Sequence, residues 1–528
     1  MGTGVVRLLL FIVLACAIPL GAEGLPVKSD LVRKSCGACH ASDSQQRMSR
    51  ISYVRKTPEG WEETIQRMAR LHGFDASPSD ARKIEQYLSG NHGLTASELE
   101  PIAYSLDGDD VQEQVPNDAV KNACTTCHSY AKIAGQRRTR EEWLGLKDLL
   151  LALFPSLVYQ HRFEDWPGLC DQALPWLADR FPLETPEWNR EKDRSAPGDG
   201  RWLLVGHQPG KGGYVGVLTM HSGADGVIQV ESKRQFADGS DASMKGTGSW
   251  ISSFAWRGSS HGAGADRVRE VFQVSADGST QRGRWLPYQH SELGSRELRY
   301  RVDSAPQIAG IVPPVIRRGR SVALRVYGAN FDSSMTPAAL KLGEGITIEK
   351  IEEAASDHVF IRVQAAPNAK LGSRDVQIGA ARKPVSLMVY DKVDYLRVLP
   401  DKSMARLGGV TAVKRFIQFE AHAFSNGPDG VPGTADDLDL GIVQASWALG
   451  ESFSSYSEQD TKYVGSIDQN GLFTPGQEGP NPQRQRSTNN AGDVWVNATY
   501  LAEGAGAPLK ARAYLIVSVP TYRELITP

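Results

Sequence analysis

The sequence predicts a multidomain protein in which an all-α N-terminal domain is followed by an antiparallel β-barrel and two β-sandwich domains. Three observations predict this order. The chain has 528 residues, which is too many for one hydrophobic core. Two runs before residue 190 begin with residues that cap helices. Beyond residue 195, short alternating strands are separated by glycine-rich turns.

Composition describes an ordinary soluble protein. Hydrophobic residues make up 41% of the chain and charged residues 23%. The formal net charge is -2, so the charge balance gives no reason to expect nucleic acid or an anionic membrane as a partner.

Residues 1–23 have the pattern of an export signal. Arg7 supplies the positive end, the run 8–20 is apolar, and small residues around Gly21–Gly24 offer a cleavage site. Cys16 lies in a loose match to a lipoprotein box, but a cysteine inside a discarded signal is the simpler interpretation. No later stretch reaches the roughly 18 apolar residues of a membrane span. We therefore expect an exported protein without an integral membrane segment.

Two Cys-x-x-Cys-His motifs, "SCGACH" (35–40) and "ACTTCH" (123–128), follow in the helical region. This spacing lets both sulfurs bond to the two vinyl groups of one haem while the adjacent histidine binds the iron. A redox dithiol or half of a zinc site is the alternative, which two copies in one exported chain disfavour. The motifs predict two covalently bound haem c groups, attached and ligated by Cys36, Cys39, His40, Cys124, Cys127 and His128.

The two haem units, 24–100 and 101–190, share a second feature. "KTPEGW" (56–61) and "RTREEW" (138–143) each place a basic residue, a capping threonine and a tryptophan at the same relative positions. In the first unit Met68 follows Trp61 by two helical turns, so its thioether faces the same side and is a candidate distal ligand. Core filling is the alternative role for Met68. Met48, His72 and, more weakly, His92 are the rival ligands.

In the second unit the position equivalent to Met68 is Leu150, which cannot bind iron. No methionine lies between the second motif and about residue 187, and His161 is the only histidine there. Three alternatives remain open: His161 ligates the second iron, this iron is five-coordinate, or a side chain such as His92 crosses over. We favour His161, although a surface histidine in a loop is nearly as good an interpretation.

The β half divides into three predicted domains. Residues 195–304 contain short strands such as "RWLLVGHQPG" and "GGYVGVLTMH", with "ADGST" and "KGTGSW" as glycine-rich turns. This pattern predicts a small antiparallel barrel or sandwich, and we favour the barrel. Residues 305–391 begin with a proline-marked edge strand and the alternating run "VALRVYG", which resembles the start of an immunoglobulin-like domain. Residues 392–528 contain "GSIDQNGLFTPG" and "GDVWVNATYL", which resemble bacterial immunoglobulin-like repeats. The diheme domain 24–190 precedes all three.

The β half has no recognisable catalytic motif. Asp429, Asp436, Asp437 and Asp439 cluster around glycines, but their spacing departs from that of an EF-hand. A solvated Asx-rich hairpin is therefore preferred over a calcium site. Hydrolase, zinc-protease, dinucleotide and P-loop fingerprints are absent from the sequence, so no catalytic residue is predicted.

This order of parts resembles the alpha subunit of quinohemoprotein amine dehydrogenase. The resemblance covers essentially the whole mature chain and is most specific at "SCGACH", "KTPEGW" with "RMARLHG", "ACTTCH", "RTREEW" and "FPSLVYQ". It implies a periplasmic αβγ heterotrimer with beta and gamma subunits, whose gamma subunit carries a tryptophylquinone made from its own Cys and Trp. That quinone oxidises primary amines to aldehydes and ammonia. The alpha haems would pass the electrons to a soluble blue copper protein or cytochrome c.

The resemblance also bears on single residues. It assigns haem attachment and proximal ligation to the two motifs and makes Met68 a distal ligand. The family position of Leu150 usually holds a histidine that ligates the second haem, so the sequence departs from the family there. We therefore expect an electron-transfer subunit. A stand-alone diheme enzyme of the peroxidase type with an open second haem is the main alternative, and an adhesin-like surface protein is a third.

Overall fold

The computed structural model describes residues 24–107, 111–223, 227–262, 267–452, 459–484 and 489–520. The predicted signal peptide, including Cys16, lies outside these residues. The contacts divide the chain into two compact units, which are described separately. The first unit comprises Met1–Leu94 and Glu113–Arg190, and the second comprises Thr95–Gln112 and Glu191–Thr527. In the part of the chain that is described, no helix is long and apolar enough to cross a membrane.

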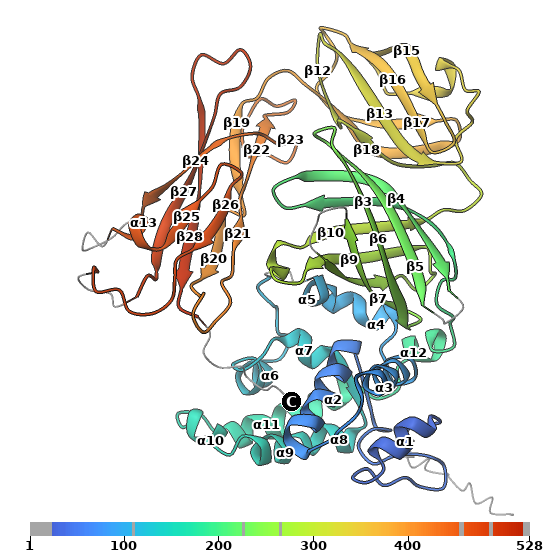
Figure 1. The fold of residues 1–528 in the computed structure, drawn as a ribbon, viewed down its shortest axis with the longest axis vertical. Coiled ribbons are helices and arrows are strands. Elements are labelled where there is room, and N and C mark those ends of the chain that lie inside the picture. Colours follow the sequence, from blue (N-terminus) through green and yellow to red (C-terminus); the bar gives the residue numbers. More distant parts are fainter. Residues whose placement is uncertain are drawn as a thin grey trace, which may run out of the picture. The chain divides into compact units, whose positions relative to one another are not determined.

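The first unit is helical, apart from one two-stranded antiparallel ribbon (Figure 1). This confirms the predicted helical N-terminal region. Its elements are α1 (Asp30–Cys36), β1 (Val54–Lys56), α2 (Pro58–His72), α3 (Pro78–Asn91), α6 (Asp118–Cys124), α7 (Tyr130–Ala134), β2 (Gln136–Arg138), α8 (Arg140–Leu144), α9 (Leu146–Leu153), α10 (Leu157–Gln160), α11 (Trp166–Arg180) and α12 (Pro186–Glu191), which ends across the unit boundary.

Both predicted capping threonines begin helices. The Thr57 side chain accepts a hydrogen bond from the Gly60 N–H of α2 at 3.1 Å, and Thr139 accepts from the Glu142 N–H of α8 at 3.3 Å. Gly73 ends α2 in the left-handed conformation, at φ 66°. The second helix differs from the first because it is divided at Gly145 into α8 and α9. Leu150 lies in α9.

One hydrophobic cluster organises the first part of this unit. It includes residues of α1, α2 and α3, and Cys36 of the first Cys-x-x-Cys-His motif packs against it. Its buried members are Val27, Val32, Met48, Ile51, Trp61, Ile84 and Leu88, and Leu31, Cys36, Ile65, Phe74 and Tyr87 pack against them. Because α2 presents Trp61 to this cluster, the face of α2 that carries Trp61 is its inner face.

The second unit begins with the short helices α4 (Ala96–Leu99), η1 (Glu100–Ile102) and α5 (Ala103–Asp107), and continues as a closed eight-stranded barrel, green in Figure 1. Each strand pairs antiparallel with its neighbour, which confirms the predicted antiparallel β-barrel. The strands are β3 (Gly200–Gln208), β4 (Gly212–Ser222), β5 (Ile228–Phe236), β6 (Asp241–Ser252), β7 (Ala255–Gly262), β8 (Val268–Val274), β9 (Thr280–Pro287) and β10 (Ser295–Arg301), with η2 (Ser291–Leu293) between the last two.

One sequence prediction within the barrel is wrong. "KGTGSW" (245–250) is part of β6 rather than a turn, and it pairs with both β5 and β7. Glycine is required at Gly246 and Gly248 because neighbouring atoms leave no room for a Cβ atom. A Cβ atom on Gly248 would lie 2.3 Å from the Trp256 ring, so this glycine makes room for the indole inside the barrel.

The barrel interior combines apolar side chains with a buried charged network. Glu297 accepts hydrogen bonds from Arg234 (Nη2–Oε2, 2.9 Å) and from Arg299 (Nε–Oε1, 2.7 Å). Arg299 also pairs with Glu270 at 3.2 Å, and the Trp256 Nε1–H donates to the same carboxylate at 3.0 Å. All these charged groups are buried. Because each charge has a hydrogen-bonded partner, the cost of burying it is offset.

Two domains of facing sheets complete the second unit. In each, the sheets enclose one hydrophobic core, as the predicted sandwiches require. The first has sheets β11-β13-β16-β15 and β12-β18-β17-β14, and the second has sheets β19-β22-β23, β20-β28-β27-β24 and β21-β26-β25. Their immunoglobulin-like character stays a prediction. The first contains β11 (Gln307–Val312), β12 (Val315–Arg317), β13 (Ser321–Ala329), η3 (Pro337–Ala339), β14 (Leu340–Lys341), β15 (Ile346–Ala354), β16 (His358–Ala365), β17 (Gly372–Ile378) and β18 (Ala381–Tyr390); the second contains β19 (Tyr395–Leu399), β20 (Lys402–Arg406), β21 (Ile417–Gln418), β22 (Glu420–Ser425), β23 (Leu438–Ile442), β24 (Ser446–Glu451), α13 (Asp460–Tyr463), β25 (Gly465–Ile467), β26 (Leu472–Pro475), β27 (Gly492–Tyr500) and β28 (Leu509–Ser518).

Candidate functional site

The two Cys-x-x-Cys-His motifs have the same local structure. Each begins at the last residue of a helix, Cys36 in α1 and Cys124 in α6. In both, the chain then turns back. The Cys39 N–H donates to the Cys36 carbonyl oxygen at 3.2 Å, and the Cys127 N–H donates to the Cys124 carbonyl oxygen at 3.3 Å. This turn brings the two cysteines of each motif close together, as attachment to a single haem requires.

Each motif histidine has one ring nitrogen engaged with a backbone carbonyl. His40 Nδ1 lies 2.9 Å from the Ser49 carbonyl oxygen, and His128 Nδ1 lies 3.3 Å from that of Ser129. An Nδ1–H that donates in this way leaves Nε2 with its lone pair free to bind iron. Burial lowers the pKa of His128, which favours the neutral ring that a metal needs. The motif histidines therefore fit proximal ligation.

The motif cysteines form no disulfide bonds. Among the described residues the unpaired cysteines are Cys36, Cys39, Cys124, Cys127 and Cys170. Burial, and next to it the partner cysteine of the motif, raises the pKa of Cys36 and raises that of Cys124 to about 11. Cys170 is buried too, with a pKa raised to about 12 by burial and by nearby Cys124. Because no disulfide engages them, the sulfurs of the two motifs are available for bonding to haem vinyl groups.

The sequence repeat corresponds to a repeated framework. Strands β1 and β2 form the β1–β2 ribbon, in which Val54 pairs with Arg138 and Lys56 with Gln136. On one side the Lys56 N–H (3.0 Å) and Trp61 Nε1–H (2.9 Å) both donate to the carbonyl of His92, at the end of α3. On the other side the N–H of Arg138 and Nε1–H of Trp143 both donate to the Phe181 carbonyl, at 3.3 Å and 2.8 Å. The two haem units are thus built alike around the ribbon.

The distal candidates of the first unit occupy different surroundings. Met68 is half-buried on α2, two turns beyond Trp61. Met48 is fully buried in the cluster around Trp61, and His72 is exposed at the end of α2. The His92 ring is buried 6.4 Å from the Trp61 ring, and burial lowers its pKa to about 4. Met68 is the half-buried candidate on the face of α2 that carries Trp61, so ligation by Met68 remains our prediction.

In the second unit Leu150 is half-buried in α9. His161 follows α10, and its Nδ1 lies 3.3 Å from Glu164 Oε2. Its ring centroid is 6.4 Å from that of Trp166, whose Nε1–H donates to the carbonyl of Ala123, the residue before Cys124. This chain of contacts connects His161 to the second motif, and its role as a ligand stays a prediction.

Sequence reasoning missed two features of this unit. Glu113 accepts the Tyr130 N–H at 2.5 Å and the Ala131 N–H at 2.9 Å, and so fixes the chain directly after His128. Lys56 and Arg138 are buried although both are cations. The basic first letter of "KTPEGW" and "RTREEW" is the feature that could have pointed to the second.

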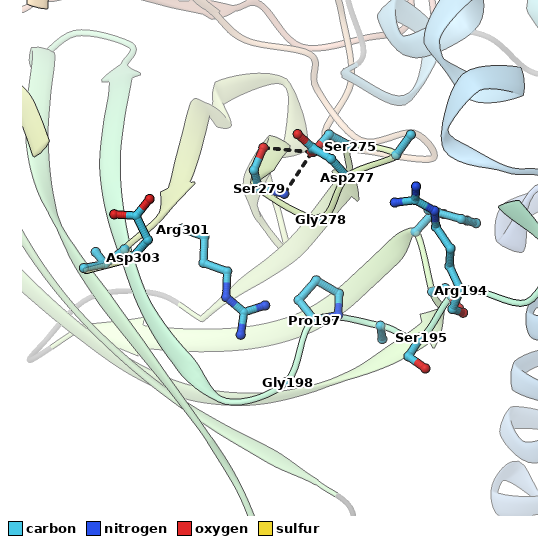
Figure 2. Close-up of a pocket in the computed structure, with 15 residues that line it drawn as sticks. Arg194, Ser195, Pro197, Gly198, Ser275, Asp277, Gly278, Ser279, Arg301 and Asp303 are labelled. Atoms are coloured by element: carbon cyan, nitrogen blue, oxygen red, sulfur yellow. Dashed lines mark hydrogen bonds between the residues drawn. The ribbon is translucent and has the colours of Figure 1, made fainter. Parts of the chain in front are cut away.

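Other parts of the described structure offer no comparable site. A cavity of about 540 Å³ is lined by residues such as Arg194, Arg301 and Asp277 (Figure 2), but Asp277 is engaged with Ser275 and Ser279 of its own turn. No group of three or more His, Cys, Asp or Glu side chains among the described residues is arranged to hold a metal ion.

The acidic turn of the last domain uses its carboxylates internally. Asp437 accepts the backbone N–H groups of Gly433 and Thr434 at 2.6 Å and 3.0 Å, and Asp439 Oδ2 lies 3.0 Å from His422 Nδ1. These contacts are those of an Asx-rich hairpin.

Comparison with solved structures gives distant likenesses. They include a de novo designed fluorescence-activating β-barrel, at 19% identity over 20% of this chain and 92% of that chain with a TM-score of 0.17. A redesigned β-barrel has 13% identity over 20% of this chain and 90% of that chain, with a TM-score of 0.17. Mouse clustered protocadherin extracellular domains 1–3 have 12% identity over 46% of this chain and 76% of that chain, with a TM-score of 0.14. These TM-scores are too low to support a structural assignment. No curated protein matches the chain.

Family models match the chain from near its first described residue to its end. Residues 27–188 match the haem-binding domain of the quinohemoprotein amine dehydrogenase alpha subunit. Residues 196–300, 305–391 and 396–525 match domains II, III and IV of the same subunit. All four domains thus occur in one chain, and the haem-binding match spans both Cys-x-x-Cys-His motifs. The chain therefore belongs to the family of quinohemoprotein amine dehydrogenase alpha subunits.

Proposed function

We propose that this chain is the diheme electron-transfer subunit of a periplasmic amine dehydrogenase complex. One haem c is attached to Cys36 and Cys39, and the other to Cys124 and Cys127. The haems receive electrons from a tryptophylquinone on a gamma subunit after oxidative deamination of a primary amine, and a soluble blue copper protein or cytochrome c receives them in turn. Membership of the family supports a haem group and a multi-subunit complex. We propose in addition the number of haems, the identity of the partner subunits, the electron acceptor and the periplasmic location.

The observation that carries the proposal is the repeated framework of the first unit. Two Cys-x-x-Cys-His turns, each at the end of a helix, lie in two units whose equivalent strands pair in one ribbon. When bound, a haem supplies one-electron redox chemistry. The chain's own residues orient the ligands, since backbone carbonyls hold the rings of His40 and His128. Trp61 and Trp143 are buried, one in each unit, and help to exclude water there.

Nothing in the described β-domains suggests that amine chemistry happens on this chain. Buried carboxylates there are held in ion pairs, as Glu297 is with Arg234 and Arg299, and the partly buried Glu420 pairs with His207 and His422. A general base needs a proton-accepting group that can reach substrate. We therefore assign the substrate step to a partner subunit and propose that the β-domains form the surface on which partners assemble.

We propose that the sandwiches are immunoglobulin-like. The sheet orders β11-β13-β16-β15 and β12-β18-β17-β14 correspond to strands A, B, E, D and to G, F, C of that fold, with β12 as an additional edge strand.

The iron of the second haem decides between two functions. With His161 as its distal ligand it is a low-spin electron carrier, which fits a relay. If neither His161 nor another side chain bound it in place of Leu150, the iron would be open and could bind peroxide, which would favour the peroxidase-type alternative.

The test is an absorption and low-temperature EPR spectrum of the oxidised chain, with haem content measured on the same sample. Two low-spin haems per chain support the relay. A high-spin signal that becomes low-spin in Leu150→His supports an open iron, and His161→Ala then leaves the spectrum unchanged. If His161 is the ligand, His161→Ala instead produces a high-spin signal. Reduction of the haems by a primary amine in the purified complex tests the electron source, and its absence would refute the amine dehydrogenase role.

A further inference from the structure

The β1–β2 ribbon carries four basic residues in two equivalent pairs, Arg55 with Lys56 and Arg137 with Arg138. All four side chains are buried, with exposed fractions from 0% for Arg55 to 8% for Lys56. A buried cation is costly unless an anion or several acceptors compensate it. The partners of each cation therefore show whether a compensating group is part of this chain.

Arg55 and Arg137 are compensated by backbone carbonyls. Arg55 donates from Nε to the Leu183 carbonyl oxygen at 2.7 Å and from Nη1 to that of Gly93 at 3.0 Å. Arg137 donates from Nη1 to the carbonyl oxygen of Ala134 at 2.7 Å. These two arginines connect segments of the fold, and their role is structural.

Lys56 and Arg138, which we call the cation pair, have neutral side chains as their hydrogen-bond partners. Lys56 Nζ donates to Thr64 Oγ1 at 2.8 Å. Arg138 donates from Nε and Nη2 to Gln136 Oε1 at 3.0 Å and 2.8 Å. Its carboxylate contact is long, with 3.9 Å between Nη1 and Glu142 Oε2. Each member lies over the tryptophan of its own haem unit, at 5.7 Å and 5.5 Å from the ring centroids.

The surroundings of the cation pair are themselves positive. Burial first, and then the charges of Arg138 and Arg67, lower the pKa of Lys56 well below its ordinary value. Burial lowers the pKa of Arg138 to about 10, although Glu142 opposes this shift. The carboxylates nearby are shared with other cations, since Glu63 pairs with Lys132 at 2.7 Å and Glu142 also pairs with Arg50 at 3.5 Å. The described residues thus leave an excess of buried positive charge at the ribbon.

The position of this charge indicates what compensates it. Lys56 and Arg138 occupy equivalent places, one in each haem unit, and the ribbon brings the two places together. A haem carries two propionate carboxylates, and a carboxylate is the anion that Lys and Arg pair with most strongly. The ligand is therefore an anion that the chain acquires twice, once for each unit.

We propose that the cation pair receives propionate carboxylates from both haems, one haem in each unit, so that the propionate edges of the two haems meet at the β1–β2 ribbon. This inference rests on the proposed two-haem function. It makes Lys56 and Arg138 positioning residues that raise the reduction potentials of both haems, because a neutralised propionate stabilises the oxidised iron less than a free one does.

The test compares Lys56→Gln and Arg138→Gln with two controls. The controls, Lys83→Gln and Arg140→Gln, remove exposed cations from the same unit, with side chains 65% and 53% exposed. Each variant is expressed as the full chain, its haem content is measured, and it is titrated potentiometrically with chemical reductants so that no amine is involved. We expect both haem potentials to fall in the cation-pair variants by about 59 mV, which is a tenfold change in a one-electron equilibrium, and to stay unchanged in the controls.

Charge-conserving variants keep the test decisive if the Gln variants do not fold. Lys56→Arg and Arg138→Lys should retain both haems and the original potentials, and a fall as large as that expected for Gln would contradict the proposal. Two haems with potentials that do not move in the Gln variants would overturn the inference and leave the electron-transfer function standing. A wild-type chain without covalent haem would instead overturn the proposed function itself.

Discussion

Replacing Gly248 by alanine should destabilise the barrel from inside. Gly248 lies in β6, and a Cβ atom there would be 2.3 Å from Trp256 Cζ2 and 2.7 Å from the Arg257 carbonyl oxygen. One of these contacts is with backbone, so a change of side-chain rotamer cannot relieve both. The barrel must therefore expand locally around β6 and β7.

The expected magnitude follows from two opposing effects. Overpacking in a filled interior costs about 1–3 kcal/mol. Replacing glycine by alanine in an extended strand returns about 0.4–1 kcal/mol, because the unfolded chain loses freedom. Gly248→Ala should therefore lower the free energy of opening by about 1–2 kcal/mol. Gly213→Ala is the matched control in β4, where the nearest atom to the new Cβ lies 3.9 Å away, and it should be neutral or slightly stabilising.

Amide hydrogen exchange measured by mass spectrometry on the intact chain suits this test, because it reports the opening of β6 and β7 without requiring the whole multidomain protein to unfold in one step. Trp256→Phe should reduce the penalty, since the smaller ring lacks the atoms that clash, and the double variant then shows a coupling of about 0.5–3 kcal/mol. Equal protection in Gly248→Ala and Gly213→Ala would refute this account of the strand.

Three further outcomes follow from buried groups. Glu297→Gln should cost about 3–5 kcal/mol in the same exchange assay, because it leaves the buried Arg234 without its carboxylate and Arg299 with Glu270 alone. The exposed Glu231→Gln should stay within about 0.5 kcal/mol. Burial alone would lower the pKa of His422, but neighbouring carboxylates raise this pKa to about 9. The stabilisation that the charged ring gives is therefore complete below about pH 6.5 and is lost as the pH rises through 9. Urea midpoints measured between about pH 6 and 10 should fall in the parent protein and stay flatter in His422→Gln. Trp143→Phe removes the 2.8 Å hydrogen bond from the indole to the Phe181 carbonyl oxygen. That oxygen still accepts the Arg138 N–H, so the loss of stability should be only about 1 kcal/mol. Earlier loss of the Soret circular dichroism on heating would measure it.

The parts of the fold that the sequence predicts well are those that depend on near neighbours. Thr57 and Thr139 cap helices because a threonine side chain reaches an N–H three residues ahead. The strand alternation beyond residue 195 is enough to predict a small antiparallel barrel or sandwich.

What the sequence does not reveal depends on contacts between distant residues. The glycine of β6 looks like a turn signal until Trp256 is placed against it. Likewise, Lys56 resembles an ordinary surface lysine until β1 pairs with β2 and buries it. The segment Thr95–Gln112 gives no sequence sign that it belongs with the second compact unit. The distal ligands of the haems stay predictions for the same reason, because ligation is decided by the packing of α9, α10 and α2 around a group that the sequence does not contain.

The β1–β2 ribbon also has a consequence for how the chain is loaded with cofactor. Neither haem unit contains a complete copy of its own framework: the Thr57 N–H donates to the Gly135 carbonyl oxygen, and the Thr139 N–H donates to that of Tyr53. A unit that fails to order therefore withdraws backbone partners from the other. On the two-haem proposal, incorporation is cooperative, and a preparation short of haem should separate into chains with two haems and chains with none. Singly loaded chains should be scarce, so the haem-to-protein ratio of a bulk sample measures the fraction of mature molecules rather than the average filling of each site.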